Sequence, residues 1–128
     1  MTFDWSEYLK LAQELGRQAV SSASQEARLR SSISRAYHAA FCQARNYLRD
    51  VEEYSVPLSP KAHIYVRNEF KSSSDRARRK IGDNLDRLRI EQRKADYEDL
   101  VAGLPSMSRM ALTLADQVIS ALSTLQRN

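Results

Sequence analysis

The chain has 128 residues, of which 42% are apolar and 28% charged, as is typical of a single soluble globular domain spanning 1–128. A single cysteine, Cys42, excludes an intramolecular disulfide, and no apolar run approaches the roughly 18 residues that span a bilayer. The N-terminal segment lacks a signal-peptide pattern, so we expect a cytoplasmic protein with no membrane contact. The net charge of +4 permits an anionic partner without requiring one.

The spacing of apolar residues predicts helices along nearly the whole chain. The first helix is expected to begin after Asp4, its N-cap, and to continue to about Val20. A serine-rich turn follows over residues 21–24. Ser24 is then expected to cap a second helix, which runs to about Asp50.

A shorter helix is predicted over about 60–71, where Ser59 is the expected N-cap and Pro60 occupies the first turn. A second serine-rich break follows over 72–75. The next long helix shows apolar residues on one side and is expected to end near Asp99.

Gly103 is the expected C-cap of that helix, and Ser106 is expected to begin the last one. Alternating apolar runs that indicate strands are absent from the sequence. Long helices with short connections predict an all-α fold, an up-and-down four-helix bundle in which the short helix is an extra element.

Polar side chains interrupt the apolar stripe of the second helix. Arg35, His38, Cys42 and Arg45 recur at intervals of three and four and therefore share a direction. Either they serve a function, or His38 is a hydrogen-bonded boundary residue and Arg35 forms an ion pair at the edge of the bundle. His38 and Cys42 leave a tetrahedral zinc site half complete, with only His63 to add, so no metal site is predicted.

The fourth predicted helix carries a polar strip. Arg89, Arg93 and Asp96 fall along one line, with Tyr97 one turn beyond Arg93. Arginines can bind phosphate through paired hydrogen bonds, and a tyrosine can stack on a base. Gln92 stands where the apolar stripe would continue, which brings polarity toward the core. The alternative is a solvated face of surface ion pairs.

Arg76, Arg78, Arg79 and Lys80 form the densest basic cluster in the chain, with no acid before Asp83. Positive charge at the start of a helix opposes the helix dipole. The cluster therefore favours an anionic partner, although charge runs are commonly solvated faces.

Two segments resemble signature elements of a known family. Residues 34–41 read Ser-Arg-Ala-Tyr-His-Ala-Ala-Phe, and residues 92–97 read Gln-Arg-Lys-Ala-Asp-Tyr. With the short helix around His63, they resemble in order and spacing the Ser-Arg-x-Tyr-Tyr-Ala-x-Phe and Arg-x-x-Ala-Asp-Tyr elements of the HEPN family. The resemblance extends from about residue 5 to about residue 125. It implies a helical bundle that commonly forms a homodimer, with its polar motif residues near the dimer cleft.

The resemblance also implies a biochemical context. Catalytic HEPN members are metal-independent ribonucleases that use an arginine, a short spacer and a histidine, and many members pair with a minimal nucleotidyltransferase in toxin–antitoxin or defence loci. This chain lacks the Arg-spacer-His motif, because Arg35 lies too close to His38 and Arg30 too far from it. The arginine expected three residues before Ala95 is Gln92, with Arg93 displaced by one position.

We therefore expect a HEPN-like module that lacks the standard ribonuclease motif, needs no cofactor, and binds RNA, a nucleotide or a nucleotidyltransferase. Its candidate binding residues are Arg76, Arg78, Arg79, Lys80, Arg89 and Tyr97. The alternative is a divergent endoribonuclease with His38 or His63 as general base, for which the catalytic candidates are Arg35, His38, Arg93 and Asp96. A third possibility is a structural subunit whose only role is assembly.

Overall fold

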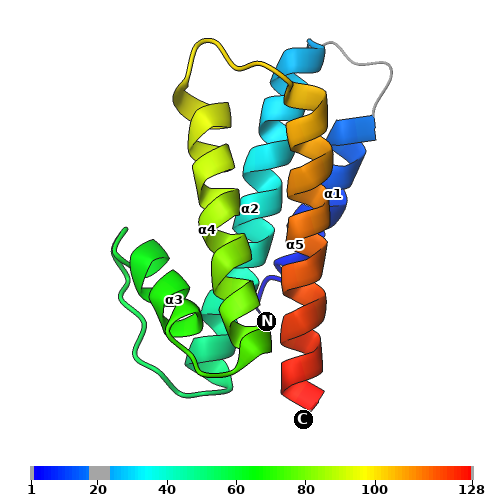
Figure 1. Cartoon of the computed structure of the whole chain (residues 1–128). Helices are drawn as coiled ribbons and strands as arrows, with labels where there is room; N and C mark the ends of the chain where they lie inside the picture. Colours follow the sequence, from blue (N-terminus) through cyan, green and yellow to red (C-terminus); the bar gives the residue numbers. More distant parts are fainter. Residues whose placement is uncertain (1, 18–23, 128) are drawn as a thin grey trace.

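The structure is a computed structural model that describes residues 2–17 and 24–127, and within these ranges it contains five helices and no strand (Figure 1). The all-α prediction is confirmed. The predicted turn over 21–24 and the end of the first helix lie largely outside the described residues. The helices are α1 (Ser6–Arg17), α2 (Gln25–Asp50), α3 (Ala62–Lys71), α4 (Arg76–Tyr97) and α5 (Leu104–Arg127).

Four of the helices, α1, α2, α4 and α5, run alternately up and down and form the bundle, while α3 lies beside α4 and the end of α2 (Figure 1). This arrangement confirms the predicted bundle with an additional short helix. Helix α2 contacts each of the other four helices. None of the described helices has the length and apolar character needed to cross a bilayer.

The core is built around a row of small side chains on α2. Ala36, Ala40 and Ala44 recur every four residues and have no exposed surface. Because alanine adds little bulk, it allows the neighbouring helices to approach α2 closely. Larger buried side chains of the other helices belong to the same core, among them Val66, Phe70, Leu88 and Val118.

Local capping signals explain where two helices begin. The hydroxyl oxygen of Ser24 accepts a hydrogen bond from the backbone N–H of Ala27 at 3.1 Å, which confirms Ser24 as the N-cap of α2. At the start of α4, a carboxylate oxygen of Asp75 accepts from the N–H of Arg78 at 3.3 Å. Helix α2 also ends at Asp50, as predicted.

The predicted start of α3 was wrong. The helix begins at Ala62, and its N-cap is Lys61, whose side chain makes no capping hydrogen bond. Ser59 instead closes the turn that precedes the helix, because its hydroxyl accepts from the N–H of Lys61 at 3.2 Å and its carbonyl accepts from Ala62 at 2.9 Å.

The role predicted for Gly103 was also wrong. Helix α4 ends at Tyr97, and α5 already begins at Leu104, two residues before the predicted start at Ser106. Gly103 has a positive φ of 73°, and its carbonyl accepts from the N–H of Met107 at 3.0 Å. It therefore leads into α5 instead of capping α4, and Pro105 fits within the first turn, where no N–H partner is needed.

Candidate functional site

A histidine on α3 joins the second and fourth helices. The Nδ1 atom of His63 lies 2.5 Å from the hydroxyl of Tyr37 on α2 and 3.3 Å from Nη1 of Arg89 on α4. The Arg89 guanidinium also lies over the Tyr37 ring, 5.6 Å from its centroid. Three helices therefore meet at one polar cluster.

The apolar pattern of α3 turns His63 toward this cluster. Val66 and Phe70 have no exposed surface, and His63 lies three residues before Val66 on the same side of the helix. The imidazole stacks on the ring of Phe41 with 4.2 Å between centroids. Packing against α2 thus holds the imidazole in one orientation.

The surroundings also set the protonation of the cluster. Burial raises the pKa of the Tyr37 phenol well above its ordinary value of 10, so the hydroxyl remains protonated. Burial, with smaller contributions from the charge of Arg89 and from His38, lowers the pKa of His63 to about 4. An arginine can only donate, so the lone pair of neutral His63 is on Nδ1 and its proton is on Nε2.

This depressed pKa makes stability depend on pH. The pKa of His63 is about 6.5 when the chain is unfolded and about 4 when it is folded. Its contribution to stability is therefore fully present above pH 6.5 and is lost as the pH falls toward 4. Solvent screens part of this effect because the imidazole is partly exposed. When the pH falls from 7 to 5, the free energy of unfolding measured with urea should therefore decrease by about 1 kcal/mol more in wild type than in His63→Gln. Equal losses in both proteins would contradict this assignment.

A chain of hydrogen bonds extends from Arg89 along α4. Nη1 of Arg89 donates to the side-chain oxygen of Gln92 at 3.4 Å, and the Gln92 amide nitrogen donates to a carboxylate oxygen of Asp96 at 2.5 Å. Gln92 is only 4% exposed, which confirms that polarity enters the core at this position. Because arginine only donates and carboxylate only accepts, the amide suits both neighbours.

The same carboxylate connects α4 back to α2. The hydroxyl of Ser34 donates to Asp96 at 3.1 Å, and Nδ1 of His38 lies 2.8 Å from the carbonyl oxygen of Ser34. Asp96 is thus positioned beside the helix segment that carries Tyr37 and His38.

Three arginines surround this cluster, and they differ in their partners. Arg67 forms an ion pair with Asp86 at 3.0 Å. Within residues 2–17 and 24–127, neither Arg89 nor Arg93 has a carboxylate within ion-pair distance. Arg89 is also half-buried. A charge that is partly removed from water without a counter-ion is unfavourable, which favours an anionic ligand at this position.

The arginines border two adjoining depressions. One is a pocket of about 210 Å³ lined by Tyr37, Phe41, Pro60, His63, Ile64, Arg67, Leu85, Arg89 and Arg93. The other is a more open hollow lined by Arg89, Gln92, Arg93 and Tyr97. Because Arg89 and Arg93 belong to both, the pocket and the hollow form one continuous surface, which we call the arginine groove.

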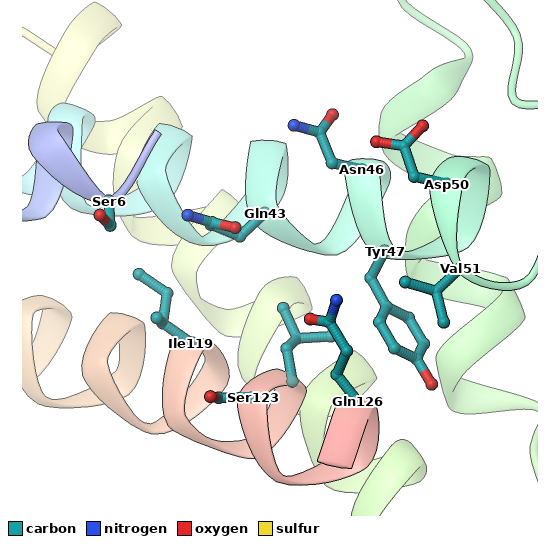
Figure 2. A pocket seen from close by; sticks show the side chains of 10 residues that line it. Ser6, Gln43, Asn46, Tyr47, Asp50, Val51, Ile119, Ser123 and Gln126 are labelled. Atoms are coloured by element: carbon teal, nitrogen blue, oxygen red, sulfur yellow. The ribbon is translucent and has the colours of Figure 1, made fainter. Parts of the chain in front are cut away.

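A different hollow, of about 380 Å³, lies between α2 and α5 (Figure 2). It is lined by Ser6, Gln43, Asn46, Tyr47, Asp50, Val51, Ile119, Leu122, Ser123 and Gln126. This lining carries one carboxylate and no cationic side chain. It therefore does not suit an anionic ligand, and it contains no residue that the sequence singled out.

The structure brings some of the sequence candidates together and separates others. Arg89, Arg93 and Tyr97 border the arginine groove, and Asp96 is linked to it through Gln92. Arg35 contacts α1 instead, because its guanidinium lies 5.2 Å from the centroid of the Tyr8 ring.

The basic run at the start of α4 is divided. The guanidinium of Arg78 makes two hydrogen bonds to the carboxylate of Glu52 and lies 4.9 Å from the centroid of the Phe70 ring. Arg79 donates to the carbonyl of Ser74 at 2.7 Å. A shallow hollow separate from the arginine groove is lined by Arg76, Arg79, Lys80, Asp83 and Asn84. The cluster is therefore less unbalanced than the sequence indicates, since Glu52 neutralises Arg78.

The Arg78 contacts should contribute measurably to stability. Lysine has no planar group to lie over the Phe70 ring, and it cannot form both hydrogen bonds to Glu52. Arg78→Lys should therefore lower the free energy of unfolding by about 1 kcal/mol. Urea unfolding measures the loss. The matched control is Arg76→Lys, at an exposed position in the same run, which should leave the midpoint unchanged. Equal midpoints for all three proteins would contradict the prediction.

The sequence does not identify Tyr37, Phe41 and Arg67 as side chains that line the groove. Tyr37 and Phe41 follow the apolar spacing of α2 and are indistinguishable there from ordinary core residues. The sequence suggests His63 as an alternative general base, as one of too few zinc ligands and as part of the short helix of the resemblance, but not as a neighbour of Tyr37 and Arg89. Its position one turn before the buried Val66 is the signal that places it against the bundle.

The comparisons with known proteins identify no similar family, protein or structure. No family model matches the chain, and no curated protein and no solved structure matches it. The likeness to HEPN proteins therefore depends on the motif residues of the sequence alone and remains a prediction.

Proposed function

We propose that this chain is a HEPN-like helical module that binds RNA through the arginine groove and lacks the standard ribonuclease motif. One observation carries the proposal: Arg89 is half-buried at the groove and has no carboxylate partner among the described residues. A phosphate group would supply the missing negative charge, and guanidinium groups bind phosphate through paired hydrogen bonds.

The chemistry around Arg89 supports a nucleic acid over a small inorganic anion. Aromatic rings lie within the groove beside its cations, with the Phe41 and His63 rings stacked in the pocket and Tyr97 in the hollow. Nucleic-acid sites combine cations for the backbone with flat side chains for the bases. The net charge of +4 favours the same class of partner.

A binding assay tests the proposal. Fluorescence anisotropy with labelled RNA at about 150 mM salt should show Arg89→Gln/Arg93→Gln binding about tenfold more weakly than wild type. The slope of log affinity against log salt should fall by about two, one for each lost phosphate contact.

The control removes the same charge elsewhere. Arg87→Gln/Arg109→Gln changes two exposed arginines outside the groove, on α4 and α5, and should keep affinity within about twofold of wild type. Equal losses in both double variants would show that net charge alone governs binding. Circular dichroism of each variant confirms that it is folded.

We also propose, from the motif resemblance, a homodimer that acts with a minimal nucleotidyltransferase in a toxin–antitoxin or defence system. Sedimentation equilibrium over a range of protein concentrations tests the dimer. A neighbouring nucleotidyltransferase reading frame, whose product co-elutes with this chain, supports the pairing. A monomer at all concentrations, with no such neighbour, argues against both.

A second candidate function is a metal-independent endoribonuclease. The observation that favours it is a neutral His63 beside Arg89. A neutral imidazole can take the proton of a ribose 2′-hydroxyl as that oxygen attacks the adjacent phosphorus, while the guanidinium stabilises the phosphate. The bond from phosphorus to the 5′-oxygen breaks, the 5′-oxygen takes a proton from water, and a 2′,3′-cyclic phosphate remains. Tyr37 occupies Nδ1 of His63, so this step requires the hydroxyl to release the imidazole.

Cleavage assays with the purified protein in EDTA distinguish the two functions. If the chain is a ribonuclease, wild type cleaves RNA and His63→Ala does not. If it is a binding module, RNA remains intact with both proteins. Cleavage that persists in both His63→Ala and His38→Ala exonerates the histidines.

A further inference from the structure

The enclosed end of the arginine groove is lined by aromatic and apolar side chains. The rings of Phe41 and His63 are nearly parallel, with 23° between their planes, and they line the pocket together with the side chains of Leu85 and Ile64. The pocket volume of about 210 Å³ is small, and its walls combine apolar side chains with the guanidinium groups of Arg67, Arg89 and Arg93. Such a pocket favours a single planar group with polar edges over a bulky one.

The open end of the groove offers a separate aromatic surface. Tyr97 is the last residue of α4 and is 78% exposed. Its ring stacks on no other aromatic ring within the described part of the chain. A large aromatic side chain left this exposed beside the cations of the groove can stack on a base.

Two cations that have no carboxylate partner among the described residues lie between these surfaces. Arg89 and Arg93 line both the pocket and the hollow, while Tyr97 follows Arg93 by one helical turn. Four residues of helix correspond to roughly 6 Å along the axis. That distance is on the scale of one nucleotide step in an extended single strand.

We propose that the arginine groove binds two successive nucleotides of a single strand, with one base in the pocket, the intervening phosphate on Arg89 and Arg93, and the next base on Tyr97. This inference rests on the proposed RNA-binding function and specifies its substrate. A base in a duplex is stacked and paired, so it can enter such a pocket only after unpairing. Single-stranded segments are therefore favoured.

The test compares strand forms by fluorescence anisotropy, using labelled single-stranded RNA, single-stranded DNA of the same sequence and the RNA duplex. We expect single-stranded RNA to bind at least tenfold more tightly than the duplex. Equal or weaker binding of single-stranded DNA agrees with the proposal, since stacking and phosphate contacts are common to both strands and the 2′-hydroxyl belongs to RNA.

Variants of Tyr97 test the second base position. Tyr97→Ala should weaken single-strand binding by about fivefold to tenfold and leave the salt slope unchanged, because no charge is lost. Tyr97→Phe keeps the ring and should bind as wild type does. The matched control is Tyr54→Ala, at an exposed tyrosine outside the groove, which should also bind normally.

The outcomes separate this inference from the function on which it rests. Equal affinity for duplex and single strand, with the dependence on Arg89 and Arg93 retained, overturns the single-strand inference and preserves RNA binding. Unchanged binding by Tyr97→Ala overturns the second base position. Absence of binding to any strand overturns both proposals.

Discussion

Replacing Gly82 with alanine should destabilise the protein by about 2–3 kcal/mol, even though alanine is the better helix former by about 1 kcal/mol. Gly82 lies inside α4, opposite Lys71, the last residue of α3. A Cβ atom at this position would lie 2.6 Å from the backbone nitrogen of Lys71 and 2.9 Å from its Cα. Backbone atoms cannot rotate aside, so α3 would have to move away from α4.

Urea unfolding measured by circular dichroism gives the size of this effect. The double variant Lys71→Ala/Gly82→Ala is the matched control, because truncating Lys71 removes its Cγ and leaves the backbone atoms in place. It should recover little of the lost stability. If Gly82→Ala unfolds at the same or a higher urea concentration than wild type, the close approach of the two helices is refuted.

Ala44→Leu should lower the free energy of unfolding by roughly 1–3 kcal/mol, and Ala40→Leu should do the same. Both alanines have no exposed surface in the row on α2 where the helices meet. Added methyl groups have no space there and would force the neighbouring helices apart.

An exposed alanine of the same helix provides the comparison. Ala27 lies in the first turn of α2 with its side chain in solvent, so Ala27→Leu should shift the melting temperature little. A melting temperature for Ala44→Leu equal to that of wild type would contradict the packing of α2 described above.

Much of the fold was predictable because its signals are local. Ser24 caps α2 through a hydrogen bond only three residues away, and the apolar spacing of each long helix is visible in a few turns of sequence. The errors at Ser59 and Gly103 also arise because only local signals are visible in the sequence. Each residue type is compatible with two adjacent roles, and only the path of the connecting segment decides between them.

The candidate site was predicted in part. The spacing of α4 correctly placed Arg89, Arg93 and Asp96 along one side, and the contact between Asp96 and Ser34 joins that side to α2. The position of α3 was not predictable, because eleven residues separate it from α2 and no periodic pattern fixes how it packs. His63 therefore reaches Arg89 through tertiary packing alone.

The ion pair between Glu52 and Arg78 shows that charge pairing, like the packing of α3, depends on tertiary contacts that the local sequence does not reveal. The two residues are 26 positions apart, so the basic run at the start of α4 had no visible counter-ion in the sequence. The neighbouring residues therefore indicate more unneutralised positive charge in that run than the structure contains. Nothing in the local sequence distinguishes Arg78, which forms an ion pair, from Arg89, which has no carboxylate partner among residues 2–17 and 24–127.

The attachment of α3 also has a consequence for how the groove could open. This ten-residue helix contacts α4 and α2 and has no contact with α1 or α5, yet it contributes His63 and Arg67 to the groove. Short segments with few neighbours undo locally at lower free energy than the molecule as a whole. If the groove binds a strand as proposed, the strand can enter and leave through local unfolding of α3 while the other four helices remain in place.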